Sequence, residues 1–289
     1  MKLIYSLKYL IEFLFIFIFF FIYKVLGTNL SSFISKKIFK FLGPFFKPKK
    51  ITESNLRRAF PKITDKEIKV YLREMWSYYG QILSEYPFLK SVRNKNFSKN
   101  IKIEGEEILK EIKTNNEKVI FVSGHFDNFE LMAMTLEKYG LKVAAIYRPL
   151  NNYFLNPVME KIRKNFICKN QIKKGRSSVR NLLKLFNNGT SIALMIDQRV
   201  SEGIKAKFFN YEAYTTTIPA QFVKKFNCRV VPIYIDRTGG MNFVLRVFKP
   251  IKFNSNDSTL SITEDLNKQL EKMILINPTK WIWTHNRWK

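Results

Sequence analysis

The sequence predicts an α/β protein with a mostly parallel central sheet flanked by helices, preceded by an N-terminal membrane-anchor helix. From residue 101 onward, short apolar segments alternate with helical ones, as in the βα units of a parallel sheet. Ahead of them, Phe13–Tyr23 (FLFIFIFFFIY) is an unbroken apolar run. The length of 289 residues allows one large domain with an appendage. We therefore expect a membrane anchor at residues 1–27, a basic-aromatic interfacial segment at 28–50 and one folded domain at 51–289.

The anchor is apolar but short. The eleven residues of the run rise only about 16 Å as a helix, against a hydrocarbon core roughly 30 Å thick. Counting from Leu7 to Leu26, with Glu12 near one interface, gives a marginal span, so a spanning and a half-inserted helix both remain open. No A-x-A-like site follows, which argues against a cleaved signal peptide. Lysines crowd the C-terminal side of the run, so the positive-inside rule predicts that the rest of the chain is cytoplasmic.

The interfacial segment mixes two kinds of side chain. Residues 33–50 interleave phenylalanines with lysines. This pattern suits a segment whose rings enter the headgroup region while its lysines meet anionic lipid. A solvated linker is the plainer alternative, and mixed basic and aromatic residues also bind single-stranded nucleic acid. The position directly after an anchor favours an anionic membrane over nucleic acid.

The folded domain opens with a helix and continues as alternating strands and helices. Thr64-x-x-Glu67 is a capping box that predicts a helix through Tyr79. We expect the last two strands to form an antiparallel edge. The predicted strands are Ile101–Glu104, Val119–Ser123, Val143–Tyr147, Ser191–Ile196, Val230–Ile235 and Phe243–Phe248. The predicted helices between and after them are Tyr153–Asn165, Ser177–Phe186, Ile218–Phe226 and Ile262–Ile276.

Composition limits the partners and the chemistry. The formal net charge is +27, from 50 basic and 23 acidic residues, which implies a polyanionic partner such as nucleic acid, an anionic membrane or an acidic protein. Cys168 and Cys228 lie far apart with no CxxC or CxxH nearby, so we expect neither a disulfide framework nor a metal site. The sequence has no HExxH motif, Gly-rich phosphate loop or dinucleotide fingerprint, so we expect no cofactor.

The strongest chemical signal follows the Val119–Ser123 strand. His125 lies in the turn between this strand and a helix expected from Asn128 to Lys138, where open α/β sheets bind ligands. A turn can fold the imidazole onto the carboxylate of Glu130, which would fix the tautomer and leave one ring nitrogen as a base. Alternatively, Asp127 and Glu130 form only a capping box, and His125 is merely packed.

Other polar residues are expected at the same edge of the sheet. Arg148 and Asp197 each follow a predicted strand, so they can converge with His125 in an anion-binding crevice, although each alone suits a solvated loop. Arg163 lies in the helix after Arg148. Ser123 lacks a G-x-S-x-G elbow, so a base without its own nucleophile points to a hydroxyl supplied by the substrate. Together with the anchor, this suggests group transfer at a membrane.

With these residues assembled, the sequence resembles the late acyltransferases of lipid A biosynthesis over roughly Asn55 to Lys289. The most specific element is the H-x4-E motif of glycerolipid-type acyltransferases, from His125 to Glu130. The segments that carry the resemblance, in the family's order, are NLRRAFP (55–61), GHFDNFE (124–130), YRPLNN (147–152), MIDQR (195–199) and the ending WIWTHNRWK (281–289).

The resemblance implies that residues 51–289 form an acyltransferase domain on the cytoplasmic side of the cell inner membrane. It implies His125 as the base and Glu130 as its catalytic partner. It also matches Arg163 to an active-site arginine and Asp197 to a family acidic residue, and we expect both, with Arg148, to bind substrate. The family commonly has a small residue and Trp where this chain has Asp127 and Phe129.

The implied reaction moves a fatty acyl chain from an acyl carrier protein donor to a hydroxyl of a phosphorylated lipid A precursor. Neither a metal nor a cofactor takes part in it, and no nucleic acid is expected as a partner. Two alternatives remain. The same dyad can acylate another lipid, such as a lysophospholipid or a glycolipid, or the chain is a non-catalytic membrane-tethered binder of anions.

Overall fold

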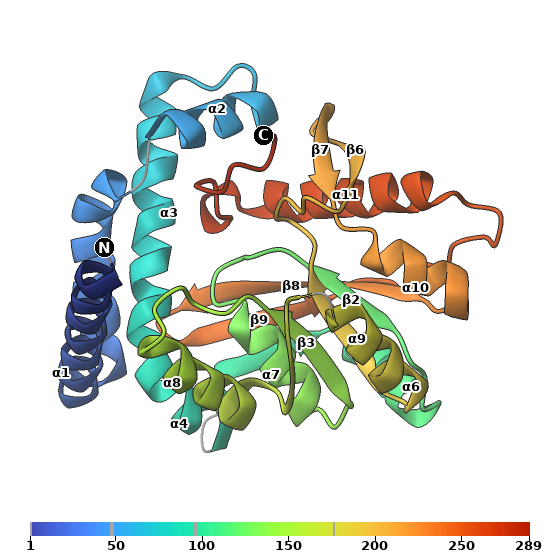
Figure 1. Ribbon diagram of the computed structural model, residues 1–289, viewed down its shortest axis with the longest axis horizontal. Helices are drawn as coiled ribbons and strands as arrows, with labels where there is room; N and C mark the ends of the chain where they lie inside the picture. The colour runs from blue at the N-terminus through green and yellow to red at the C-terminus, as the bar shows by residue number, and fades with distance from the viewer. Residues whose placement is uncertain (1, 47–48, 95–96, 176) are drawn as a thin grey trace.

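A seven-stranded sheet forms the centre of the computed structural model, which describes residues 2–46, 49–94, 97–175 and 177–289 (Figure 1). The strands lie in the order β1-β9-β8-β2-β5-β3-β4, and all described neighbours in this sheet are parallel except β8 and β9. The predicted α/β class with a mostly parallel sheet is therefore confirmed. The strands are β1 (Ile101–Glu104), β2 (Ile120–Ser123), β3 (Val143–Tyr147), β4 (Asn170–Lys173), β5 (Ser191–Met195), β8 (Val230–Gly239) and β9 (Asn242–Val247).

All six predicted strands are present, and β8 pairs with β9 in the antiparallel sense that the sequence predicts. The expectation that this pair forms an edge is wrong, because β1 pairs with β9 on its other side. The register opposes Ile101 to Phe243, and both side chains are buried. Burial of this apolar pair stabilises the pairing of β1 with β9. The order of the strands along the chain does not predict this pairing.

A separate two-stranded hairpin of β6 (Ile204–Phe208) and β7 (Tyr211–Thr215) was not expected from the sequence. Its two turn residues, Phe209 and Asn210, have φ values of 48° and 64°, as in the turns that suit a two-residue hairpin. The hairpin packs on the last long helix, where the Asn267 amide donates to the Lys207 carbonyl at 2.9 Å.

Helices cover both faces of the sheet, with α11 along one side and α7 and α8 along the other (Figure 1). The predicted helix at 153–165 divides into α8 and a π-helical turn at Arg163–Ile167. The α-helices are α1 (Lys2–Leu42), α2 (Lys49–Ala59), α3 (Asp65–Glu85), α4 (Leu89–Asn94), α5 (Phe97–Asn100), α6 (Glu106–Thr114), α7 (Glu130–Lys138), α8 (Leu155–Ile162), α9 (Ser178–Asn187), α10 (Ile218–Phe226) and α11 (Thr259–Ile276). Single 3₁₀ turns lie at Gly43–Phe45, Tyr86–Phe88 and Pro278–Lys280.

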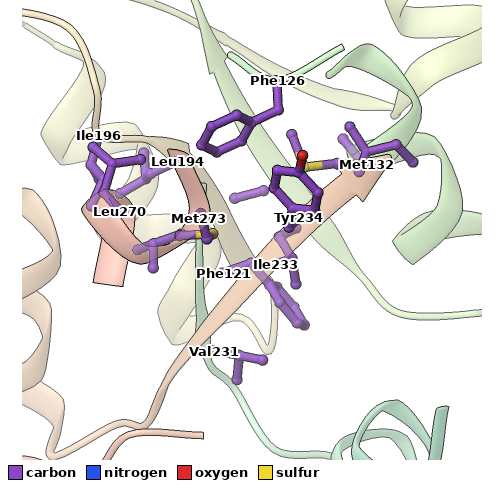
Figure 2. Packing of buried hydrophobic residues seen from close by; sticks show 14 of the residues in the cluster. Phe121, Phe126, Met132, Leu194, Ile196, Val231, Ile233, Tyr234, Leu270 and Met273 are labelled. Atoms are coloured by element: carbon purple, nitrogen blue, oxygen red, sulfur yellow. The ribbon is translucent and has the colours of Figure 1, made fainter. Parts of the chain in front are cut away.

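The core packs directly behind the carboxyl ends of β2 and β5. Figure 2 shows Leu194 and Ile196 beside Leu270 and Met273 of α11. Phe126, just after β2, packs against Tyr234 of β8, with ring centroids 4.8 Å apart and the ring planes tilted by 57°. Every residue of β2 is buried, as expected for a central parallel strand covered on both faces. A rigid apolar layer therefore supports the loop that follows β2.

The first helix, α1, is a hairpin of two helical halves. Gly27 has φ 74° and ψ 173°, which interrupts the helix, and glycine adopts such a backbone without a steric penalty. The Tyr23 hydroxyl donates to Ser35 Oγ at 3.1 Å, whereas residues twelve apart in one straight helix lie about 18 Å apart. We call residues 2–42 the anchor hairpin. The predicted interfacial segment begins within it, and its residues 47 and 48 lie outside the described part of the chain.

The anchor hairpin is the part of the described chain that meets the requirements for a membrane helix. Ser6–Phe45 is long and apolar enough to cross a membrane, and only 6% of the qualifying window is buried inside the protein. Its second half packs on α3, where Ser35 Oγ donates to the Gly80 carbonyl at 2.6 Å. Exposed apolar side chains continue along both halves, including Phe15, Phe21, Phe33 and Phe41. This surface is suited to lipid rather than water.

The predicted capping box on α3 is confirmed. Thr64 Oγ1 accepts from the Glu67 N–H at 3.3 Å, and Thr64 N–H donates to Glu67 Oε2 at 2.8 Å. The helix continues beyond the expected end at Tyr79 to Glu85. Gly80 does not end it because the anchor hairpin packs against the backbone at this position.

Candidate active site

The register of β2 and β5 brings two sequence candidates together. The strands are parallel neighbours, and Ser123 pairs with Met195. The pairing continues one step further, because the Ile196 N–H donates to the Ser123 carbonyl at 2.9 Å. His125 and Asp197 each lie two residues beyond the paired residues, so they meet at the carboxyl edge of the sheet. The expected convergence of these two residues is therefore observed.

Asp197 holds the His125 ring and its backbone. His125 Nδ1 lies 2.8 Å from Asp197 Oδ1, and the His125 N–H donates to Oδ2 at 2.8 Å. The Trp281 indole N–H also donates to Oδ2, at 2.9 Å. Asp197 is only 2% exposed, and although burial alone raises its pKa, His125 and Trp281 lower that pKa to about 2. Asp197 is therefore an ionised carboxylate with both oxygens occupied, which is unlike the substrate-binding residue that we expected.

The environment of His125 suits a proton acceptor. Burial lowers the pKa of the imidazole, but the charge and hydrogen bond of Asp197 together with the charge of Glu130 raise it, and the net pKa lies above its ordinary value. The bond to Asp197 uses Nδ1, which in the neutral ring is then the N–H donor. Nε2 remains as the nitrogen with a lone pair, and the side chain is 18% exposed. His125 can therefore accept a proton from a group that enters the site.

The expected pairing of His125 with Glu130 is wrong. Glu130 is the first residue of α7, and its Oε1 accepts from Arg163 Nε at 2.8 Å and Nη2 at 2.7 Å. The Tyr86 hydroxyl donates to the same oxygen at 2.8 Å. Because an arginine and a tyrosine on other elements hold the carboxylate, it does not orient the imidazole.

The capping-box alternative is also wrong. The residue before α7 is Phe129, and no side-chain cap bond forms there. Asp127 was the expected N-cap, but it has φ 40°, outside the extended conformation that N-caps adopt. Its carboxylate is directed to other partners, described below. Glu130 therefore has a tertiary contact rather than a local one, and its partner Arg163 begins the π-helical turn after α8.

Arg163 and Glu130 place opposite charges beside the ring. Glu130 raises the pKa of His125 and Arg163 lowers it, so both groups lie close enough to act on the imidazole. The guanidinium also lies over the Tyr147 ring, 5.7 Å from its centroid. Nε and Nη2 of Arg163 bind Glu130, and the Tyr86 hydroxyl also interacts with the guanidinium. Glu130 and Tyr86 therefore fix the guanidinium close to the imidazole.

Backbone donors after Gly124 are already used within the protein. The next three N–H groups donate in turn to the Asp197 carboxylate, to the Gly124 carbonyl and to the Lys280 carbonyl. An oxyanion that forms beside His125 must therefore use side-chain donors or donors from other loops. This leaves Arg163 as the charged donor that the structure places beside the ring.

Arg148 and a second histidine border the site. Arg148 directly follows β3, is exposed, and has no described hydrogen bond. The pKa of His285 is lowered, mainly by burial. The positive charge of Arg148 also lowers this pKa, whereas the Asp197 carboxylate raises it. His285 Nε2 accepts the Arg199 N–H at 2.9 Å, so its ring is neutral and fixed. Neither His285 nor Trp281 is among the site residues that the sequence predicts, although both lie in the terminal WIWTHNRWK segment.

Neither a metal-binding cluster nor a reactive thiol accompanies these side chains among the residues that the structure describes. In the described part of the chain, no three His, Cys, Asp or Glu side chains are grouped so that they could hold a metal ion. Burial raises the thiol pKa of Cys168 to about 12 and that of Cys228 to about 11, so both remain protonated. The arrangement is thus a buried carboxylate, an imidazole and a nearby arginine.

Comparison with known proteins gives a consistent result. The chain is 23% identical to the "Lipid A biosynthesis acyltransferase" of Haemophilus influenzae over 244 residues, covering 83% of this chain and 76% of that protein. It is 23% identical to the "Lipid A biosynthesis myristoyltransferase" of Escherichia coli, covering 79% and 71%, and 24% identical to the "Lipid A biosynthesis palmitoleoyltransferase" of the same organism, covering 89% and 84%.

One solved structure, the 1-acyl-sn-glycerophosphate (LPA) acyltransferase of Thermotoga maritima, matches with a TM-score of 0.44 and 13% identity, over 89% of this chain and 100% of that one. This likeness is too low to support an inference. The sequence profile described as "Bacterial lipid A biosynthesis acyltransferase" matches residues 2–289, which is nearly the whole chain. The chain therefore belongs to the bacterial lipid A biosynthesis acyltransferase family and is an acyltransferase.

Proposed function

We propose that the protein transfers a fatty acyl chain from an acyl carrier protein to a hydroxyl of a lipid A precursor, in the biosynthesis of lipopolysaccharide or lipooligosaccharide. The observation that carries this proposal is the pairing of His125 with the buried Asp197, which leaves Nε2 as a base. Family membership supports acyl transfer as the class of reaction. Both cysteine thiols remain protonated, so we assign the role of nucleophile to the acceptor hydroxyl, activated by the His125–Asp197 pair.

The proposed mechanism is a single proton relay through His125. Nε2 removes the proton of the acceptor hydroxyl as the oxygen attacks the thioester carbonyl carbon. The tetrahedral intermediate then collapses, the carbon–sulfur bond breaks, and the imidazolium returns the proton to the leaving thiolate. The Asp197 carboxylate stabilises the imidazolium between these steps. General-base assistance of this kind contributes about 10²–10⁴-fold.

The arginines have separate roles in this mechanism. Arg163 stabilises the oxyanion of the intermediate with its positive charge, and Glu130 acts through Arg163 by binding its Nε and Nη2 donors. Arg148 is exposed at the rim and is suited to a phosphate of the acceptor. Glu130 is thus required for turnover even though it does not contact the base.

The partners and location follow from charge and from the anchor hairpin. The net charge of +27 suits three anions, namely an acidic acyl carrier protein, a phosphorylated lipid and an anionic membrane, without any need for nucleic acid. We place residues 51–289 on the cytoplasmic side of the inner membrane, because lysines crowd the C-terminal side of the apolar run. The relatives are named for different acyl chains, so their names do not select one for this protein.

The test is a turnover assay of the purified protein with carrier protein loaded with acyl chains of different length, against a panel of acceptors. We expect acylation of a lipid A precursor, and its loss in His125→Ala, with Arg58→Gln as a matched control outside the site. Turnover with only a lysophospholipid or glycolipid would replace the proposed acceptor. Full activity of folded His125→Ala would overturn the mechanism.

A further inference from the structure

Asp127 lies between the two residues of the H-x4-E motif and has an unusual backbone. Its φ is 40°, in the left-handed region that favours glycine and that aspartate tolerates better than most residues. This one residue turns the chain from the end of β2 into α7. The position of His125 at the start of the turn and of Glu130 at its end therefore depends on what holds Asp127 in this conformation.

A buried arginine holds it. The Asp127 carboxylate is fully buried, and Oδ1 accepts from Arg237 Nη2 at 2.7 Å and Nε at 3.1 Å. Oδ2 accepts the Arg237 backbone N–H at 3.1 Å, and Lys280 Nζ lies 3.4 Å away. Oδ1 also accepts the N–H of Asn128 at 2.9 Å, which closes the turn locally. Both charged partners come from outside the turn, on β8 and on the 3₁₀ turn after α11.

The next residue, Asn128, is connected to Arg237 through Glu85. Glu85, at the end of α3, binds the Arg237 guanidinium and accepts from Asn128 Nδ2 at 2.7 Å. Asn128 is therefore tied to α3 while Asp127 is tied to β8. We call Glu85, Asp127, Arg237 and Lys280 the buried ion cluster. Its side chains are at most 5% exposed, so they do not face a substrate.

The cluster supports both members of the His125–Asp197 pair. Asp127 follows His125 by two residues, and its N–H donates to the Lys280 carbonyl at 3.2 Å. Lys280 precedes Trp281, whose indole donates to Asp197. The Asp127–Lys280 contact therefore connects the chain that carries the His125 imidazole with the chain that carries the hydrogen-bond donor to the Asp197 carboxylate.

Stability is a poor explanation for such a cluster. Buried ion pairs seldom stabilise a fold more than apolar residues of the same size, because desolvation offsets their attraction, and a well-attested use is to specify one arrangement over others. At position 127 this chain combines a left-handed backbone with a carboxylate that pairs with a buried arginine.

We propose that Asp127 and Arg237 are positioning residues, which lock the H-x4-E turn so that His125 stays in hydrogen-bond contact with Asp197. This inference rests on the proposed role of His125 as the base. The two side chains do not take part in the reaction. Their effect is on the geometry of the residues that do, where a displacement of about 1 Å can cost on the order of 100-fold in rate.

The test compares Asp127→Asn, Arg237→Gln and the double variant with the native protein. Each change removes a charge from the cluster and keeps much of the side-chain shape. We expect kcat to fall by about 10- to 100-fold with little change in KM, because acceptor and donor contacts are unaltered. The double variant should be little worse than either single variant, since the two residues act as one unit. Glu117→Gln, which removes an ion pair with Arg229 just before β2 begins, is the matched control and should keep native kcat.

A second measurement separates positioning from a general loss of structure. The chain has only two histidines, so nitrogen chemical shifts of labelled histidine can follow the His125 pKa directly. The charged groups that act on this ring are Asp197, Glu130 and Arg163. If the turn shifts away from Asp197, the contact that raises the pKa weakens and burial lowers it, so Asp127→Asn should titrate at lower pH than native protein.

Asp127→Gly distinguishes the ion pair from the backbone. Glycine accepts the left-handed conformation without strain, so it should restore native kcat if only the backbone matters. We expect it to resemble Asp127→Asn, because Arg237 loses its partner in both. If Arg237→Gln fails to fold, Arg237→Lys keeps the charge but loses the forked contact, and we expect the same changes at smaller size. Native kcat and native His125 pKa in Asp127→Asn would overturn this inference alone, whereas an active His125→Ala overturns the proposed function.

Discussion

Asp197 accepts two hydrogen bonds from one residue, at the ring and at the backbone of His125, and a third from Trp281. The backbone bond fixes where the histidine starts, and the ring bond fixes which way it points. A carboxylate held in this way does not need to move when the imidazole becomes charged. Such preorganisation is the usual physical source of catalytic advantage in a buried site.

Replacing Asp197 by Asn should change the pH dependence in a defined direction. The proposed base His125 can accept a proton only when it is neutral, so the proposal predicts that kcat/KM falls as the pH drops through its pKa. The Asp197 charge raises that pKa and burial lowers it. In Asp197→Asn the acid limb of the kcat/KM profile should therefore move to lower pH, while the maximum falls by about 10²–10⁴-fold.

Trp281→Phe is the matched variant for this measurement. It removes one neutral donor from Asp197 and leaves the carboxylate charged. The acid limb should then stay close to its native position, with a smaller loss of rate. An acid limb that is the same in native protein and Asp197→Asn would show that another group controls the profile.

The sequence identifies His125, Asp197 and Arg163 as candidates but pairs His125 with Glu130 instead of Asp197. Glu130 seemed the natural partner of His125 because it is five residues away, while Asp197 is 72 residues away. Proximity along the chain can be read from a sequence. The register of two parallel strands is set by packing, so it cannot be read from the sequence in the same way. The contacts of Asp127 are hidden for the same reason, since Arg237 lies on a strand 110 residues later.

Among the elements, α3 is the helix against which the second half of the anchor hairpin packs. At Gly80 the two helices are in direct contact, since a Cβ there would lie 2.5 Å from the Ser35 carbonyl oxygen and 2.7 Å from Phe39 Cβ. Gly80 is thus required for the close approach of the helices, and not for a turn. The same contact explains why α3 runs through a glycine without ending.

Gly80→Ala should force the anchor hairpin away from α3. Overpacking of a well-packed contact costs about 1–3 kcal/mol, which should lower the Tm of the detergent-solubilised protein. Gly175→Ala is the control, because a Cβ at Gly175 would meet nothing within 4 Å. An equal Tm for both variants and the native protein would show that the α1–α3 contact does not stabilise the fold.

The elements that the sequence predicts well are those with a strong local signal, such as the Thr64 capping box and the buried strands β2 and β5. The strands that it misses lack such a signal. β4 is a short, half-exposed edge strand of mostly polar residues. The β6–β7 turn consists of Phe209 and Asn210, and a phenylalanine with positive φ does not resemble the usual Asn-Gly turn.

At the scale of the whole molecule, the anchor hairpin lies along the domain instead of leaving it. Its first half contacts the domain near both ends, through Tyr9 with Tyr153 and through Phe20 with Tyr86. Glu12, one turn after Tyr9, accepts a hydrogen bond from the Asn152 amide at 3.3 Å. A carboxylate in the centre of a bilayer is costly, and here it has a polar partner at the protein surface instead.

We therefore expect the N-terminus and the C-terminus to lie on the same side of the membrane. Reporter fusions at each end should both behave as cytoplasmic, and the protein should need detergent for extraction. A half-inserted hairpin with its lysines at the interface accounts for this outcome. Reporters in opposite compartments would show a spanning helix, and two reporters outside the cytoplasm would overturn the assignment of the catalytic side.

The position of β1 at the sheet edge has a consequence for the order of assembly. β1 is held by β9, and the Glu104–Arg246 contact across them joins residues 142 apart. Asn55 likewise donates to the Trp283 carbonyl, 228 residues later. Contacts of such separation form slowly and last, whereas the two halves of the anchor hairpin are neighbours in the chain. During synthesis on the ribosome, we therefore expect the anchor hairpin to bind the membrane first. The rest of the chain then completes its sheet while it is already tethered to the membrane from which the proposed lipid substrate comes.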